Sequence, residues 1–293
     1  MKGIVDTHLH FWDPTVRHHD WLRNYPELNR RFGPEDFDAG GHEIAGAVFV
    51  QADARDDEAL DEVRWVTRMA SEHPWICGIV AFAPVDAGPA AARALEALGG
   101  EPLVVGVRQL LQGWPAEAIT AAALVQGVRL LSVLGLSFDV CVTSGQLPAV
   151  AELARRCPET TFVLDHVGKP QLTDGGLDAW RHDLARLAAC PNVLCKLSGL
   201  ATEISSGRLA VAAPPLLEHA IEVFTPSRCM IGSDWPVVTL SSSAVVWFDL
   251  VLDVIGRLAP GEQRAIVHDN AVAAYGLRLP ALIGCDARDP VHR

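Results

Sequence analysis

Residues 4–10 read Ile-Val-Asp-Thr-His-Leu-His, a short apolar run that ends in two histidines. If this run is a β-strand, His8 and His10 project to the same side, because side chains alternate along a strand. Seven further runs rich in Val, Ile, Leu and Phe follow, as expected of strands buried on both faces, at residues 46–51, 76–85, 104–111, 136–143, 161–167, 193–200 and 229–237. The sequence therefore predicts eight strands.

Helical stretches alternate with these runs and are predicted at residues 56–71, 90–98, 117–134, 146–156, 177–189, 215–224, 244–258 and 261–275, the last with a break near Asn270. Alternating strands and helices indicate parallel β/α units. An open doubly wound sheet would be expected to carry a glycine-rich phosphate-binding turn after the first strand, and none is present in the sequence. We therefore predict an α/β fold, a closed (β/α)₈ TIM barrel.

The predicted barrel is a single catalytic domain over residues 1–278, followed by a tail at 279–293. Residues 11–37 form a long loop after the first strand, rich in Trp, His, Arg and Pro. Loops after the strands build the active-site face of a barrel, so we expect this segment to cover the pocket.

Composition narrows the class of protein. The chain of 293 residues has a formal net charge of −12 and no cluster of Lys or Arg, which argues against nucleic-acid and membrane-surface partners. Neither a secretory signal nor an uninterrupted apolar run of about 18 residues is visible, so a cytoplasmic location is expected. The seven widely spaced cysteines are predicted to be free thiols. The oligomeric state stays open.

Polar side chains occur at the ends of six predicted strands. Such groups are costly to bury without partners, and in a barrel the carboxyl ends of the strands meet at one mouth. The residues concerned are His8 and His10, Gln51, Arg108 and Gln109, Asp165 and His166, Lys196 and Ser198, and Ser233, Asp234 and Trp235. We expect them to form one site.

Four of these residues suit a metal: His8, His10, His166 and Asp234. Two imidazoles at this spacing can ligate one ion, commonly zinc, although a hydrogen-bonded histidine pair is the alternative. Asp234 is a candidate metal ligand or general base, or else caps the following loop. His166 is a candidate catalytic residue, or else a buried histidine paired with Asp165.

The remaining candidates also have structural alternatives. Lys196 lies in an apolar strand and is either catalytic or part of an internal salt bridge. Arg108 and Gln51 are candidates for holding substrate oxygens. The alternatives are a structural ion pair for Arg108 and a place in the barrel interior for Gln51. Trp12 and Trp235 are candidates for the floor of a sugar site, and otherwise belong to the core. Ser233 is not in a GxSxG elbow, which disfavours a serine hydrolase.

The chain resembles the amidohydrolase superfamily, and most closely its branch of sugar-acid lactonases, which includes L-fuconolactonase and L-rhamnonolactonase. The resemblance spans residues 3–276 and rests on the segments 5–13, 50–52, 106–108, 146–148, 163–170, 195–200 and 230–237. It implies a β/α barrel that hydrolyses a lactone to the open hydroxy acid. It also implies that His8, His10, His166 and Asp234 hold a metal or the attacking water.

Three positions depart from the family pattern. The fourth strand offers Arg108 where two-metal members carry Lys, and the fifth offers Val140 and Cys141 where they carry His. These departures argue against a binuclear centre and leave two alternatives, one divalent metal, with zinc favoured, or none. Gln109 stands where fuconolactonase-like members have His, which weakens the case for that particular lactone.

The predicted function is therefore lactone hydrolysis by water that Asp234 activates, with His166 and Lys196 assisting. One alternative is a zinc-dependent nonoxidative decarboxylase of an unsaturated or aromatic acid on the same scaffold. A second alternative is a noncatalytic barrel that binds sugar acids.

Overall fold

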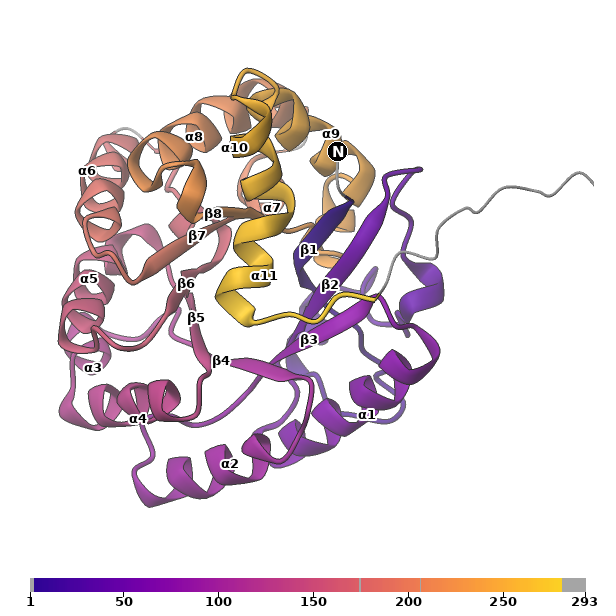
Figure 1. Ribbon diagram of the computed structural model, residues 1–293, viewed down its shortest axis with the longest axis vertical. Helices are drawn as coiled ribbons and strands as arrows, with labels where there is room; N and C mark the ends of the chain where they lie inside the picture. Colours follow the sequence, from indigo (N-terminus) through magenta and orange to yellow (C-terminus); the bar gives the residue numbers. More distant parts are fainter. Residues whose placement is uncertain (1–2, 174, 206, 281–293) are drawn as a thin grey trace, which may run out of the picture.

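Eight parallel strands in the order β1 to β8 form one sheet at the centre of the computed structural model, which describes residues 3–173, 175–205 and 207–280 (Figure 1). The strands are β1 Ile4–Leu9, β2 Ile44–Val50, β3 Ile76–Ala81, β4 Val104–Leu110, β5 Ser137–Cys141, β6 Phe162–Leu164, β7 Val193–Leu197 and β8 Cys229–Ile231. A parallel bridge between Leu9 and Trp235 links the end of β8 to β1. The predicted barrel is confirmed.

Strands β6 and β8 are shorter than predicted. Both stop before the polar residues of their motifs, because the backbone then turns into the left-handed region. His166 has a φ of 55° and Asp234 a φ of 61°, values that a strand cannot accommodate. The two candidate site residues therefore lie in tight turns just beyond the strands.

Helices surround the sheet, and Figure 1 shows most of them as an outer ring, with α11 lying across one end of the barrel. They are α1 Ala59–Glu72, α2 Pro89–Gly99, α3 Ala116–Ile119, α4 Ala122–Val133, α5 Leu147–Arg156, α6 Gly176–Ala188, α7 Leu200–Glu203, α8 Leu209–Phe224, α9 Ala244–Ile255, α10 Pro260–Arg264 and α11 Asn270–Tyr275. Helix α8 begins at Leu209, before the predicted start at residue 215. Pro214 and Pro215 therefore lie inside the helix and not at its beginning. The predicted break near Asn270 is not found: the π-helical turn Ala265–Asp269 joins α10 to α11, and Asn270 keeps right-handed helical φ and ψ.

The stretch Ala116–Val133 is long and apolar enough to cross a membrane, judged by length and composition. In the barrel it forms the separate helices α3 and α4, and α4 packs on β5 and α2. Leu124, Val128 and Leu131 form the buried face of α4. Packing in the outer helical layer therefore accounts for the apolar residues on this face.

The amino ends of the strands are covered by the end of the chain. After α11, Leu277 and Leu279 lie so close to β3 and β2 that a Cβ on Gly78 or Gly46 would approach them to 2.9 and 2.6 Å. The hydroxyl of Tyr275 on α11 donates to buried Asp139 at 2.7 Å. Most of the predicted tail, residues 281–293, lies outside the described residues. This end of the barrel is thus filled, and a ligand must enter from the opposite end.

The long loop after β1 folds over that opposite end. Trp12 pairs with Phe32 in an antiparallel bridge, and its indole N–H donates to the carbonyl of Leu28 at 3.0 Å. The same segment supplies Trp21 and Tyr25 to the wall of the main cavity. It therefore covers the pocket, as expected from its position in the sequence.

A buried carboxyl group, Glu62 on α1, supports the loop after β2 by accepting the backbone N–H of Ala52 at 3.1 Å. Burial raises the pKa of Glu62 from 4.5 to about 7. The folded protein thus holds a proton that the unfolded chain releases, so this residue lowers stability as the pH rises from about 4.5 through 7.

We expect Glu62→Gln, which keeps the accepting oxygen, to stabilise the protein at pH 8 by about 2–3 kcal/mol and to change little at pH 4.5. Urea denaturation at the two pH values measures this difference. Glu218→Gln, at an exposed position, is the matched control. An equal effect of Glu62→Gln at both pH values would contradict the assignment.

Candidate active site

A cavity of about 700 Å³ opens at the carboxyl ends of the strands. Its wall includes four of the predicted site residues, His10, Arg108, His166 and Asp234. These side chains come from segments far apart in the sequence, namely the ends of β1, β4, β6 and β8. The barrel has therefore gathered them at one place, which makes this cavity the candidate active site.

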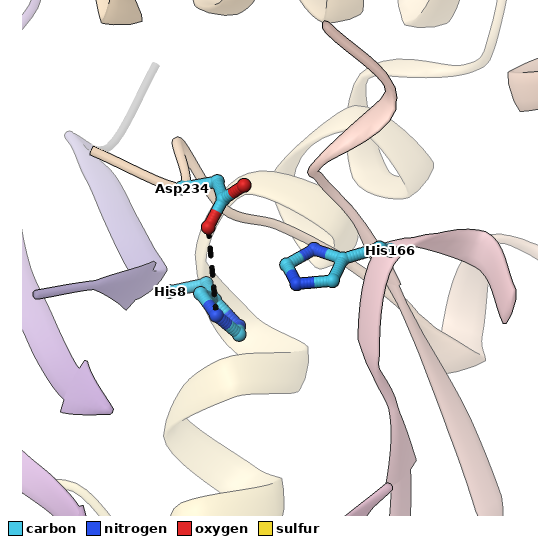
Figure 2. Close-up of side chains that lie close together, drawn as sticks. All are labelled: His8, His166 and Asp234. Atoms are coloured by element: carbon cyan, nitrogen blue, oxygen red, sulfur yellow. Dashed lines mark ion pairs between the residues drawn. The ribbon is translucent and has the colours of Figure 1, made fainter. Parts of the chain in front are cut away.

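Three side chains in the site could hold a metal ion. His8, His166 and Asp234 each offer one ligand atom, and these atoms lie within 4.8 Å of one another. Figure 2 shows the three side chains converging from different elements, with His8 Nε2 lying 3.8 Å from Asp234 Oδ1. His10, the fourth predicted ligand, lies outside this trio but close to Asp234.

The geometry of the contact between His10 and Asp234 indicates whether a cation can bind beside these two side chains. Nδ1 of His10 lies 2.7 Å from the carbonyl oxygen of Val50, which can only accept, so Nδ1 carries the proton. In the neutral ring Nε2 is then a second acceptor, and it lies 3.5 Å from Asp234 Oδ1. Two acceptors this close require a proton, a water or a cation between them. The donor set therefore fits one divalent ion.

The imidazole ring of His8 contacts a network of buried charged side chains. Its Nδ1 lies 3.2 Å from both Asp165 Oδ1 and Lys196 Nζ, and its Nε2 lies 3.3 Å from Arg108 Nη1. Lys196 also contacts Asp139 Oδ2 at 2.5 Å and Asp165 Oδ1 at 3.1 Å. These groups are all within the barrel interior. They orient the His8 ring from below the cavity.

Besides His8, four predicted site residues do not reach the cavity wall. Lys196 is fully buried under His8, so its amine holds the internal salt bridges that were the alternative reading. The Gln51 side chain accepts the backbone N–H of Asp53 at 2.6 Å, and Gln51 does not line the cavity. Trp12 and Trp235 pack with Phe32 beneath the covering loop. None of these four residues lines the cavity, so the catalytic role of Lys196 and the substrate contacts of Gln51, Trp12 and Trp235 stay predictions.

The ionisation of the remaining groups suits hydrolysis. Burial alone would raise the pKa of Asp234, but His166, His10 and His8 outweigh it and hold this pKa well below its usual range. Burial lowers the pKa of His166 to about 4 and that of His8 well below its usual value. At neutral pH the site thus presents a carboxylate and neutral imidazoles.

The described cysteines are free and buried, as predicted, and Cys285 lies outside the described residues. Cys141 alone among them lines the main cavity within the described part of the chain. Burial raises its pKa to about 11. Its thiol is therefore protonated at neutral pH and is a poor nucleophile.

Three cavity residues were missed by the sequence reasoning: Asp53, Lys169 and Glu203. Asp53 and Lys169 have φ values of 55° and 46°, so they share with His166 and Asp234 the left-handed backbone. Such conformations concentrate at functional sites. The only available signal was that Lys169 lies three residues after His166, inside a motif already singled out.

Gly199 leaves the space that the His166 ring occupies. A Cβ there would lie 2.2 Å from His166 Nδ1, and the φ of Gly199 is 68°. Ser198, the preceding residue, contacts the same nitrogen through Oγ at 3.0 Å. The turn after β7 thus fixes the position of His166 in two ways. Gly199 has no side chain that would clash with the ring, and the hydroxyl of Ser198 contacts Nδ1 of the ring.

We expect Gly199→Ala to lower kcat/KM by about 100-fold, because a displacement of about 1 Å in a catalytic group can have that cost. Steady-state kinetics on the best substrate measures it. Gly135→Ala is the matched control, since Gly135 has a φ of 70° and nothing within 4 Å of an added Cβ. Equal effects of the two substitutions would mean that backbone strain, and not displacement of His166, causes the loss.

Comparisons with known proteins show what this chain is similar to. The amidohydrolase family model matches residues 5–277. The chain is 32% identical to the L-fucono-1,5-lactonase of Burkholderia multivorans, and the match covers 94% of this chain and 97% of the relative. It is 29% identical to the L-fucono-1,5-lactonase of Burkholderia ambifaria, and that match covers 96% of this chain and 98% of the relative. A zinc-bound amidohydrolase structure from Burkholderia multivorans superimposes with a TM-score of 0.82 at 30% identity, with 94% of this chain and 100% of that chain covered.

Proposed function

Because the chain belongs to the amidohydrolase family, we propose that it is a lactonase that opens a sugar-acid lactone to the hydroxy acid. The observation that carries the proposal is the position of Asp234. Its ionised carboxylate lines the cavity beside His8, His10 and His166, where a water and a carbonyl group can meet. The names of the two lactonase relatives support the substrate class.

In this mechanism Asp234 takes a proton from water, and the resulting hydroxide forms a bond to the lactone carbonyl carbon. The carbonyl electrons move to oxygen and give a tetrahedral oxyanion. When they return, the bond to the ring oxygen breaks, and Asp234 transfers its proton to that oxygen. Because the low pKa of Asp234 makes it a weak base, the carbonyl needs strong electrophilic support from the opposite side.

His8, His166 and Asp234 would hold one divalent ion, and we favour zinc, which would polarise the carbonyl and lower the pKa of bound water. His166 suits either a metal-dependent or a metal-free site, because the Ser198 hydroxyl at its Nδ1 can donate or accept. With the Ser198 hydroxyl donating, Nε2 carries the proton and can bond the carbonyl oxygen. With the hydroxyl accepting, Nε2 has its lone pair free.

In this proposal Arg108 has mainly a structural role, because its guanidinium group contacts other groups of the protein. Its Nη1 lies 3.1 Å from Asp165 Oδ2, and its Nη2 donates to the carbonyl of Gln51 at 2.6 Å. Its charge is thus paired with that of Asp165. The names of the two lactonase relatives favour a sugar-acid lactone over an aromatic or unsaturated acid, the substrate of the decarboxylase alternative.

A panel of aldonolactones and muconolactones, followed by pH-stat titration with and without chelator, tests the proposal. We expect release of one acid per aldonolactone, and metal analysis of the same samples decides between the metal-dependent and metal-free alternatives. Carbon dioxide release from an aromatic acid without lactone opening would favour the decarboxylase. Tight binding without turnover would favour the binding barrel. The cytoplasmic location and the absence of nucleic-acid and membrane partners stay predictions.

A further inference from the structure

Lys169 places an ammonium group in the cavity. It ends a turn in which His166, Val167, Gly168 and Lys169 all have positive φ, between 46° and 70°. Its Nζ lies 3.2 Å from Oε1 of Glu203, and both residues line the cavity. The turn that carries His166 therefore carries a cation into the same space.

The other two cations of the site each contact several buried groups. Lys196 contacts Asp139, Asp165 and His8 and does not reach the cavity wall. Arg108 bonds Asp165 and the carbonyl of Gln51 and contacts His8. Within residues 3–173, 175–205 and 207–280, the recorded partner of the Lys169 ammonium is Glu203 alone. An ammonium has three donors, so Lys169 retains donors for a ligand.

The charges around Lys169 keep it protonated. Burial alone would lower its pKa, but Cys141, Glu203 and Asp234 outweigh it and raise this pKa. Lys169 and Asp234 both line the same cavity. A carbonyl group between them would face a base on one side and a hydrogen-bond donor on the other.

We propose that Lys169 is a catalytic residue that donates a hydrogen bond to the lactone carbonyl oxygen and stabilises the oxyanion formed there. Glu203 is a positioning residue, which holds the Lys169 ammonium against the wall. This inference rests on the proposed function and deepens it, since it names a donor for the oxyanion that lactone opening forms. It also assigns to Lys169 the part that the sequence suggested for Lys196.

The first test compares Lys169→Met with Lys169→Arg in the full-length protein, on the best lactone. We expect the Met variant to lose 100- to 1,000-fold in kcat, about the effect of one oxyanion donor, with KM within about threefold. The Arg variant should recover part of the loss. A kcat within threefold of the wild type, or a loss confined to KM, would overturn the catalytic role.

The second test concerns Glu203. Glu203→Gln should lower kcat by about tenfold with KM and melting temperature unchanged, and should add nothing to Lys169→Met in the double variant. Additive losses would show that Glu203 does not act through Lys169. Arg257→Met and Glu218→Gln are matched controls, because these residues form an exposed ion pair at 3.3 Å outside the cavity.

A binding measurement separates failure of this inference from failure of the proposed function. Gluconate carries a carboxylate that resembles the oxyanion, and Trp21 in the cavity wall reports its binding by fluorescence. Even if no lactone is turned over, the wild type should bind gluconate, and Lys169→Met should weaken binding at least tenfold. Equal affinities, or no binding by the wild type, would overturn the inference.

Discussion

Asp234→Asn is expected to lower kcat by about 10³–10⁴-fold, at the upper end of what a general base contributes. The amide cannot accept the proton of water, and it removes the negative charge that faces His8 and His10. KM should change little, because the substituted group acts on water and not on the sugar hydroxyls. Steady-state kinetics over a pH range of 5 to 9 measures the loss, which should persist throughout that range.

The fold should survive this substitution. Asn tolerates the left-handed φ of 61° at this position as well as Asp does, and the backbone bond from the N–H of residue 234 to the carbonyl of His8, 2.7 Å, does not involve the side chain. Asp178→Asn, at an exposed helix position, is the matched control. Near-wild-type kcat in Asp234→Asn would show that another group activates the water.

Lys196→Met is expected to lower the free energy of unfolding by about 3–5 kcal/mol, because removing one partner leaves buried charges without their counterion. Asp139 and Asp165 are fully buried, and both contact the Lys196 ammonium. Methionine has a similar length but no charge. Urea denaturation followed by far-ultraviolet circular dichroism measures the change.

A double variant distinguishes lost charge from lost packing. In Lys196→Met/Asp139→Asn one unpaired carboxylate is removed, while Tyr275 can still donate to the remaining oxygen. We therefore expect this variant to recover part of the lost stability. Arg155→Met, which breaks an exposed pair with Glu152, should cost no more than about 1 kcal/mol. A loss below 1 kcal/mol in Lys196→Met would contradict the counterion role.

The candidate site depends on this network for its geometry. Asp165 contacts His8, Lys196 and Arg108, so the ring of His8 cannot rotate without breaking contacts to charged groups. Lys196 therefore affects the site only through His8 and Asp165. Both stability and catalysis should fall when it is removed, and the loss of stability should be seen also in the absence of substrate.

The eight strands could be predicted because their signal is local. A run of apolar β-branched residues, followed by an amphipathic stretch, specifies a buried strand and an outer helix wherever it occurs. The convergence of His8, His10, His166 and Asp234 could also be predicted, since the carboxyl ends of parallel strands meet at one mouth. The sequence alone thus determined the barrel and the residues at its centre.

Which polar side chains face the cavity was decided by the tertiary structure. The sequence indicated Lys196, which lies in an apolar strand, and not Lys169, but Lys196 lies beneath His8 and Lys169 lines the wall. The difference comes from partners distant in the chain, Asp139 for one and Glu203 for the other, and from left-handed turns that local patterns do not reveal. Burial and backbone strain are properties of the packed molecule, so only the assembled barrel assigns these side chains their positions.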